Sequence, residues 1–248
     1  MRRDRGAMRF VEQALRAHCK VRRALGGARG ASRYPRAVPA VRTVENSVLN
    51  IHARAAMSRV LDPLGEWLAK AGVSANLITV IGSVGAVVGG LLFFSHGWWF
   101  SGAVLIWACV MLDMVDGAVA RASGSPTAFG GVLDSTGDRV ADAAIFGGIA
   151  WYYARHDGPA MLAAALLCLV LGSVTSYIRA RAEAAGLTAA VGIAERAERL
   201  IIVLVGTGLL GLGVPYVQAI ALWLLVAASA VTVGQRMATV YHQSERRG

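Results

Sequence analysis

Four aspartates at fixed spacing are the residues best suited to chemistry in this 248-residue chain. Asp113 and Asp116 lie three residues apart, and Asp134 and Asp138 lie four apart, so each pair shares one helix face. Their surroundings are apolar enough to lie in a membrane, where ionisable side chains are costly and usually functional. Carboxylates cannot neutralise one another, and four together suit one or two divalent cations, Mg²⁺ or Mn²⁺.

Two other interpretations of these aspartates stay open from the residues alone. Arg121 and Arg139 lie nearby and could form ion pairs with them, although two arginines cannot neutralise four aspartates. The aspartates could also line a cation pathway in a channel or transporter. Asp142, one turn beyond Asp138, suits metal ligation and a structural role equally well.

The composition predicts a membrane protein. Hydrophobic residues make up 56% of the chain and the mean hydropathy is +0.53, which is too apolar for an ordinary soluble domain. We expect an all-α integral membrane fold of six transmembrane helices, preceded by a cytoplasmic amphipathic surface helix over 48–71. The six apolar stretches are approximately 77–95, 98–120, 128–152, 159–182, 198–213 and 216–238.

Charge divides the chain into three parts. Residues 1–45 form a basic, mostly disordered arm, residues 46–242 the membrane domain, and residues 243–248 a short tail. The first 42 residues hold 12 of the 25 Lys and Arg and only two acidic residues, which accounts for the whole net charge of +10. On a membrane protein such an arm favours an anionic membrane surface over nucleic acid, so no nucleic-acid partner is expected.

Arginines concentrate at one side of the six stretches, which places both termini and the acidic cluster at the cytoplasmic face of the cell membrane.

Eight residues in and around the acidic cluster stand at fixed spacing. They are Asp113, Asp116, Gly117, Ala120, Arg121, Gly130, Asp134 and Asp138. This pattern resembles, without a gap, the signature D-x2-D-G-x2-A-R-x8-G-x3-D-x3-D of the CDP-alcohol phosphotransferase family. The resemblance covers about residues 48–240 and implies a six-helix intramembrane enzyme, usually a homodimer. Such enzymes take a CDP-linked donor and an alcohol acceptor and release CMP.

The resemblance assigns roles to the acidic residues. It places the metal ligands, with Mg²⁺ or Mn²⁺ as two bound ions, on Asp113, Asp116, Asp134 and Asp138. It places the general base, which deprotonates the acceptor hydroxyl, on Asp138. A carboxylate beside a metal is a weak base, so its position must matter as much as its proton affinity.

Further residues are assigned to the donor. The segment SANLIT, residues 74–79, resembles the family's P-N-x-x-T, with Ala75 in place of proline. From the residues alone, Gly117 also suits helix packing, Arg121 a surface charge, and Thr127 a helix cap. The residues that the resemblance implies for binding CDP-diacylglycerol are Asn76, Thr79, Gly117, Arg121 and Thr127.

Three arginines are candidates for binding a phosphorylated acceptor. Arg179, Arg196 and Arg236 come from three helix ends on the cytoplasmic side, where they could bind a phosphate or simply anchor the helices. Residues 176–187 and 195–200 resemble stretches of the actinobacterial phosphatidylinositol phosphate synthases, with Arg179 where lysine is common. That resemblance implies inositol 1-phosphate as the acceptor. A supporting ion-pair network is expected among Arg181, Glu183, Glu195 and Arg199.

The predicted reaction transfers the phosphatidyl group of CDP-diacylglycerol to inositol 1-phosphate and releases CMP, as a step of phospholipid biosynthesis. Asp138 takes a proton from the acceptor hydroxyl, and the alkoxide attacks the phosphorus that bears diacylglycerol. Two alternatives remain. A synthase of phosphatidylglycerophosphate would use glycerol 3-phosphate in a similar basic pocket, and a cation transporter would release no CMP.

Overall fold

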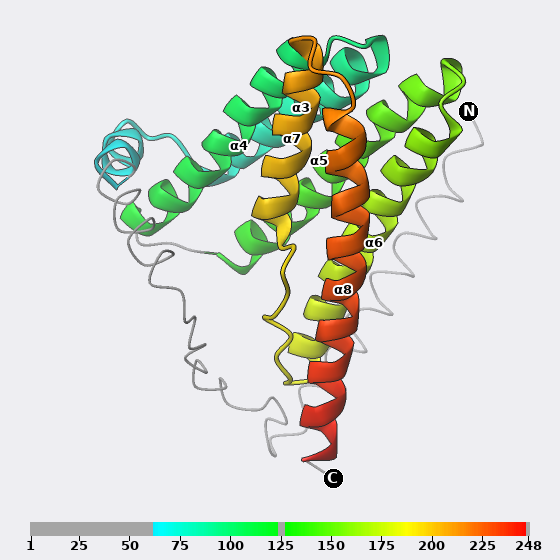
Figure 1. Cartoon of the computed structure of the whole chain (residues 1–248). Coiled ribbons are helices and arrows are strands. Elements are labelled where there is room, and N and C mark those ends of the chain that lie inside the picture. Colours follow the sequence, from blue (N-terminus) through cyan, green and yellow to red (C-terminus); the bar gives the residue numbers. More distant parts are fainter. Residues whose placement is uncertain (1–61, 124–126, 247–248) are drawn as a thin grey trace, which may run out of the picture. The chain divides into compact units, whose positions relative to one another are not determined.

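Six long helices make up most of the computed structural model, which describes residues 62–123 and 127–246 (Figure 1). No strand occurs within these ranges. A short helical segment over 62–70 precedes the six. The elements that follow are α3 (Ala75–Val88), which continues as η1 (Gly89–Phe93) and η2 (Phe94–His96), α4 (Trp99–Ala122), α5 (Ala128–Arg155), α6 (Pro159–Ala184), α7 (Arg196–Gly211) and α8 (Val217–Glu245). All six predicted apolar stretches are therefore helical.

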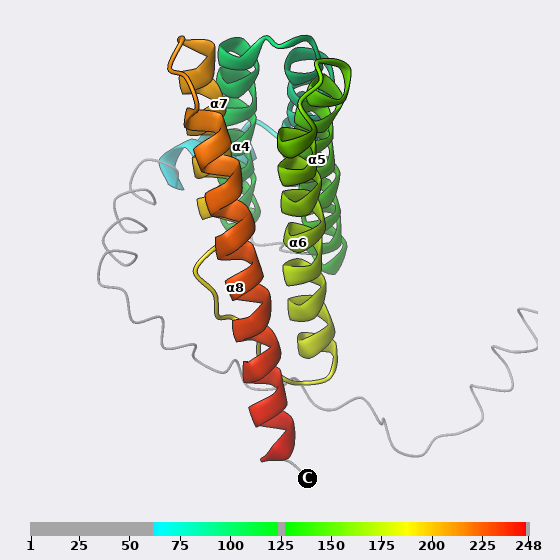
Figure 2. The same cartoon turned by 45° about the vertical axis from the view of Figure 1, so that its right-hand side comes forward.

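The helices close into a ring whose order differs from the chain order. Helix α3 packs against α4, α4 against α7, α7 against α8, α8 against α6, α6 against α5, and α5 against α3. Figure 2 shows the two sides of this ring, with α4, α7 and α8 on one side and α5 and α6 on the other. Because successive helices run in opposite directions, the starts of α3, α5 and α7 share one end with the last turns of α4, α6 and α8. That end carries the acidic cluster.

One hydrophobic core joins the helices. Phe94, Ile106, Ile145 and Leu222 are fully buried in it, and they come from different helices. At Gly90 the π-helical turn η1 lies directly on α5, since a Cβ there would lie 2.5 Å from the backbone of α5. Glycine allows this close backbone approach, which is typical of helices packed in lipid.

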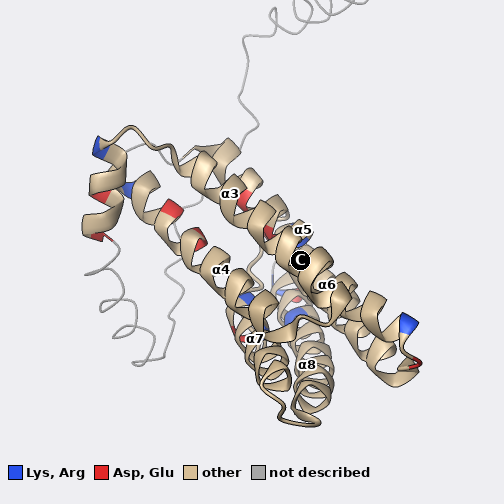
Figure 3. Cartoon of the chain, turned by 90° about the horizontal axis from the view of Figure 1, so that it is seen from above, with Lys and Arg blue, Asp and Glu red and all other residues tan. Residues whose placement is uncertain are grey.

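Four of the six long segments are long and apolar enough to cross a membrane. They are Ala75–His96, Trp99–Ala122, Pro159–Ala184 and Val217–Glu245. Helix α7 has only 16 residues, and α5 carries Asp134, Asp138, Arg139 and Asp142 before its last three turns. Charged residues occupy few positions along the described helices (Figure 3). The structure thus confirms an all-helical protein with several apolar helices.

The segment over 62–70 is the described part of the predicted surface helix. Its Gly65 lies on α4, since a Cβ there would be 2.8 Å from the Ala118 backbone. Asp62 forms an ion pair of 3.2 Å with Arg121, also on α4. The predicted arm, residues 1–45, and the start of the surface helix lie outside the described residues, as do the last two residues of the tail.

The opposite end of the ring is aromatic. Trp99 packs edge-on against Tyr152 at 4.6 Å between ring centroids. The Tyr153 hydroxyl is 2.6 Å from Gln218 Oε1, and Gln218 Nε2 donates to Thr207 at 3.0 Å. Aromatic side chains of this kind are typical of the interfacial ends of helices that cross a membrane, and here they lie away from the acidic cluster.

Candidate metal and phosphate site

Three carboxylates from two helices converge at the start of α5. Asp113 and Asp116 come from α4 and Asp134 from α5, and their ligand oxygens all lie within 4.8 Å of one another. Asp116 is buried, while Asp113 and Asp134 are partly buried. The two antiparallel helices therefore bring the predicted pairs together. An all-oxygen acidic set of this kind fits a hard divalent cation such as Mg²⁺ or Mn²⁺.

Thr79 supports this acidic set from α3. Its hydroxyl donates a hydrogen bond to the Asp116 carboxylate, and both side chains are buried. Such a partner fixes the orientation of a ligating carboxylate. The sequence assigned Thr79 to the nucleotide alone, and its contact with Asp116 joins residues 37 positions apart, which spacing does not reveal.

Asp138 lies next to the three-carboxylate group without belonging to it, and it faces an arginine. Arg196 Nη1, from the first turn of α7, lies 2.8 Å from Asp138 Oδ1 and 3.4 Å from Asp113 Oδ2. The alternative in which Arg121 neutralises the acidic cluster is wrong, because Arg121 pairs with Asp62 instead. Arg139 does approach Asp138, at 3.9 Å. The main guanidinium at the cluster is thus Arg196, which the sequence assigned only to the acceptor.

Asn76 and Thr127, which are assigned to the donor, meet Gly130 of the signature where α3 and α5 begin. Thr127 is the N-cap of α5, and its hydroxyl accepts a hydrogen bond of 2.9 Å from the Gly130 amide. A Cβ on Gly130 would lie 3.1 Å from Thr127 Oγ1 and 3.3 Å from Asn76 Oδ1. Asn76, Thr127 and Gly130 therefore form one polar corner beside Asp134. The helix-cap interpretation of Thr127 is confirmed.

Gly117 and Arg121 lie one turn apart on α4. A Cβ on Gly117 would meet only the Arg121 guanidinium within 4 Å among the described atoms, at 3.4 Å, so this glycine does not serve helix packing. Arg121 is largely exposed, as is its partner Asp62. Exposed ion pairs contribute little to stability, so this pair holds the guanidinium only weakly.

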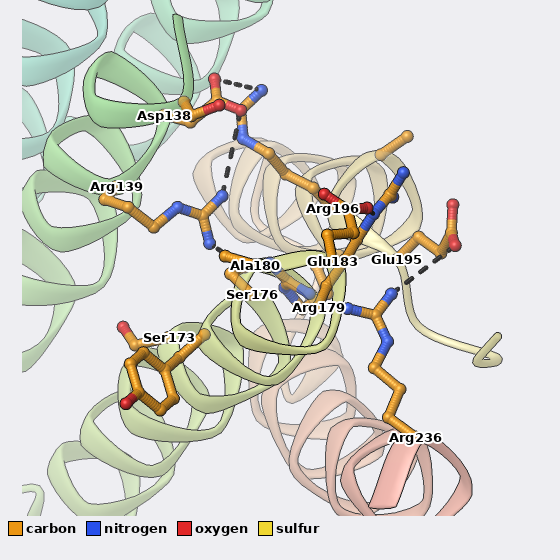
Figure 4. Close-up of a pocket in the computed structure, with 14 residues that line it drawn as sticks. Asp138, Arg139, Ser173, Ser176, Arg179, Ala180, Glu183, Glu195, Arg196 and Arg236 are labelled. Carbon is orange, nitrogen blue, oxygen red and sulfur yellow. Dashed lines mark hydrogen bonds and ion pairs between the residues drawn. The ribbon is translucent and has the colours of Figure 1, made fainter. Parts of the chain in front are cut away.

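A cavity of about 690 Å³ opens beside Asp138 and is lined by arginines from four helices. The three predicted acceptor arginines, Arg179, Arg196 and Arg236, all line it, so they do converge (Figure 4). Arg139 and Arg199 line it as well. The remaining polar lining consists of Ser135, Asp138, Ser173, Ser176, Tyr177, Glu183 and Glu195.

The ion pairs around this cavity differ from the predicted network. Glu195 pairs with Arg236 at 3.6 Å rather than with Arg199. Glu183 pairs with Arg179 at 3.0 Å. Arg181 forms no ion pair with any described residue. The reason is geometric, because consecutive positions on a helix point in different directions and only some face the neighbouring helix.

Three cavity arginines, Arg139, Arg199 and Arg236, donate hydrogen bonds to backbone carbonyls or hydroxyls. Arg236 is 4% exposed, and it donates to Val191 O at 2.8 Å and to Thr175 O at 2.7 Å. Arg139 donates to the Ser176 hydroxyl. The sequence predicts Arg139 only as an ion-pair partner of the aspartates. Its place directly after Asp138 is the sequence signal that could have assigned it to this cavity.

The chain matches a known protein family over most of its described part. The CDP-alcohol phosphatidyltransferase model matches residues 72–233. The chain is 45% identical over 222 residues to the phosphatidylinositol phosphate synthase of Streptomyces avermitilis, a match that covers 86% of this chain and 90% of that protein. It is 44% identical over 200 residues to the corresponding synthase of Mycobacterium tuberculosis, covering 79% and 92%.

Solved structures of the Mycobacterium tuberculosis synthase resemble this fold. The structure with CDP-DAG bound has a TM-score of 0.70 and 42% identity, covering 74% of this chain and 94% of that one. The complex with manganese and citrate has a TM-score of 0.69 and 43% identity, covering 73% and 88%. The similarity therefore extends through the ring of helices that carries the acidic cluster and the arginine cavity.

Proposed function

The chain belongs to the CDP-alcohol phosphatidyltransferase family, and we propose that it transfers the phosphatidyl group from CDP-diacylglycerol to inositol 1-phosphate, with release of CMP. The observation that carries this proposal is one continuous site. The three-carboxylate group lies next to Asp138, and the arginine cavity opens on the other side of Asp138. The acceptor phosphate would meet the positive charge of the arginine cavity, and the donor diphosphate would meet the divalent cations that the carboxylates would hold. The relatives that carry the synthase name support this choice of acceptor.

The donor side would be built from the acidic set and the polar corner. Asp113, Asp116 and Asp134 would hold Mg²⁺ or Mn²⁺, with Asp138 completing a site for two ions. Such metals supply positive charge against a diphosphate. The residues proposed to contact CDP-diacylglycerol are Asn76, Thr79, Gly117, Arg121 and Thr127. The CDP-DAG-bound and manganese-bound structures of the Mycobacterium tuberculosis protein support both parts of this proposal.

Asp138 is the proposed general base. It lies between the acidic set and the arginine cavity, so an acceptor bound in the cavity would place a hydroxyl within its reach. Arg196 at 2.8 Å favours the charged carboxylate, the form that accepts a proton. The alkoxide formed from the acceptor would attack the phosphorus that bears diacylglycerol, and CMP would leave.

We propose six membrane crossings, with both termini and the site at the cytoplasmic face. Helix α5 would cross because its charged residues face other helices: Asp142 is buried, whereas Val132 and Val140 are exposed on the outer face. At 1.5 Å per residue α7 is roughly 24 Å long, which local thinning of the bilayer accommodates.

The segment over 62–70 would lie on the membrane surface, and CDP-diacylglycerol would enter sideways from the lipid. A homodimer is proposed from the family resemblance.

An acceptor panel tests the proposed function. Purified protein is given CDP-diacylglycerol, Mg²⁺ or Mn²⁺, and inositol 1-phosphate, glycerol 3-phosphate or free inositol, and CMP release is measured. We expect CMP with inositol 1-phosphate. Release of CMP with glycerol 3-phosphate alone would contradict inositol 1-phosphate as the acceptor. No CMP with any acceptor, together with metal flux into liposomes, would favour a cation transporter.

Arg196→Ala tests the arginine cavity as the acceptor site. We expect the KM for inositol 1-phosphate to rise about tenfold or more, because a charge-assisted contact to the phosphate is lost. The KM for CDP-diacylglycerol should change little. Arg155→Ala is the matched control, since Arg155 is an exposed arginine at the opposite end of α5. An unchanged acceptor KM in Arg196→Ala would leave this arginine with a structural role only.

A further inference from the structure

Asp142 is a buried carboxylate that the proposed reaction does not use. It lies on α5 one turn beyond Asp138 and is 5% exposed. Three guanidinium groups surround it. Arg139 Nη2 lies at 3.4 Å, Arg196 Nε at 3.6 Å and Arg199 Nη2 at 3.6 Å. These arginines come from α5 and α7, so Asp142 links the two helices that form opposite walls of the site.

The buried polar atoms of this group have few other partners. Asp142 Oδ1, Arg196 Nε and Arg199 Nη2 form no hydrogen bond with any described residue. Burial of a carboxylate is costly, and the ion pairs with the three arginines offset part of that cost for Asp142. The negative charge of Asp142 in turn offsets the repulsion among the three arginines, so they can lie close together. Its role is therefore electrostatic, and it acts on the orientation of the arginines.

Arg196 makes contacts on two sides at once. Its Nε faces Asp142, while its Nη1 reaches Asp138 at 2.8 Å and Asp113 at 3.4 Å. Figure 4 shows Arg196 extending toward Asp138 at the edge of the arginine cavity. One side of the guanidinium is thus anchored, and the other is presented to the reacting groups. A planar guanidinium can make both contacts, whereas an ammonium group is a single point charge.

Arg199 is fixed independently of Asp142. Its Nη1 donates to Ala194 O at 3.2 Å and to Thr175 Oγ1 at 3.4 Å. Arg139 is fixed by its hydrogen bond to Ser176. Among the three arginines, Arg196 is the one with no such bond to a backbone carbonyl or hydroxyl of the described residues. Loss of Asp142 would therefore disturb Arg196 most.

We propose that Asp142 is a positioning residue, which sets Arg196 between Asp138 and the phosphate of the acceptor. This inference rests on the proposed function, because it assumes that the arginine cavity takes a phosphorylated acceptor. Asp142 touches neither substrate nor metal in this proposal. It acts through Arg196, and its removal should weaken phosphate binding without a direct loss of any substrate contact.

A double-mutant cycle tests the coupling. Binding of inositol 1-phosphate and of glycerol 3-phosphate to the detergent-solubilised protein is measured by titration calorimetry for the parent, Asp142→Asn, Arg196→Ala and the double variant. We expect Asp142→Asn to lower the affinity for the preferred phosphate about tenfold or more. In the Arg196→Ala background, Asp142→Asn should cause little further loss, because its effect passes through Arg196. Additive losses, or parent-like affinity in Asp142→Asn, would overturn the proposal.

A control and a second variant separate positioning from stability. Gln218 is a buried amide at the aromatic end, so Gln218→Leu perturbs a buried polar group far from the site and should leave phosphate affinity unchanged. If Asp142→Asn does not fold, Arg196→Lys decides the question. Lysine keeps the charge but cannot contact Asp142 and Asp138 together, so phosphate affinity should still fall. Parent-like affinity in Arg196→Lys would refute the positioning role.

The two proposals fail in different measurements. If the proposed transferase reaction is wrong, CMP is not released with any acceptor, while the phosphate-binding cycle still reports on Asp142. If the inference is wrong, CMP release proceeds and phosphate affinity does not depend on Asp142. Binding of neither phosphate by the parent protein would overturn the inference.

Discussion

Replacing Asp138 with asparagine is expected to lower kcat for CMP release by about 10²- to 10⁴-fold, the usual contribution of a positioned general base. Asparagine keeps the size of the side chain but cannot accept the proton of the acceptor hydroxyl. Asp138 lies outside the three-carboxylate group, so most Mn²⁺ binding should survive in this variant. The measurements are single-turnover CMP release and Mn²⁺ titration followed by electron paramagnetic resonance.

The matched control for this variant is Asp157→Asn. Asp157 is exposed in the turn after α5, and its φ of 51° suits asparagine as well as aspartate. The substitution is chemically the same but lies at the opposite end of the helix, so activity should be unchanged. Full turnover in Asp138→Asn would show that Asp138 is not the general base. Loss of both turnover and Mn²⁺ binding would instead make Asp138 primarily a metal ligand.

Replacing Asp116 with asparagine is expected to abolish measurable Mn²⁺ binding and, with it, CMP release. Asp116 is the most buried of the three converging carboxylates, and its loss leaves Asp113 and Asp134 as an incomplete ligand set. Thr79→Val should have a smaller effect, lowering Mn²⁺ affinity about 10- to 100-fold, because the hydroxyl orients Asp116 without binding metal itself. Titration without nucleotide separates this effect from any contact between Thr79 and the donor.

Thr207→Val is the control for the metal variants. Thr207 is a fully buried threonine that accepts a hydrogen bond from Gln218 at the aromatic end, so it reports on the loss of a buried hydroxyl alone. We expect parent-like Mn²⁺ affinity in this variant. Parent-like affinity in Asp116→Asn would rule out the proposed metal site. Equal affinities in Thr79→Val and the parent would show that the hydrogen bond to Asp116 does not serve the metal.

The acidic cluster was largely predictable because its information is local. Asp113 and Asp116, and Asp134 and Asp138, stand at helical spacing within two consecutive helices, and short connections make consecutive helices antiparallel. Consecutive antiparallel helices place such pairs at the same depth. The approximate positions of the six helices were predictable for a similar reason, since an apolar run in the sequence marks each of them.

Contacts between helices distant in the sequence were not predictable. Arg196 meets Asp113 across 83 positions, and this contact requires α4 to pack against α7 rather than against α5. The order of helices around the ring decides such contacts, and hydropathy does not encode it. The predicted network among Arg181, Glu183, Glu195 and Arg199 does not form as expected for the same reason, because Glu195 pairs with Arg236 on α8.

The sequence by itself determined a membrane-embedded helical protein, an acidic cluster spaced for divalent metal, and an excess of arginine on the same face. These properties follow from residue type, run length and helical period. Only the tertiary structure decided which arginine meets which carboxylate: Arg196 at Asp138, Arg121 away from the cluster, and Asp142 among three guanidinium groups. The physical reason is that the rotation of each helix about its axis, set by packing of small residues across the ring, selects the side chains that point into the site.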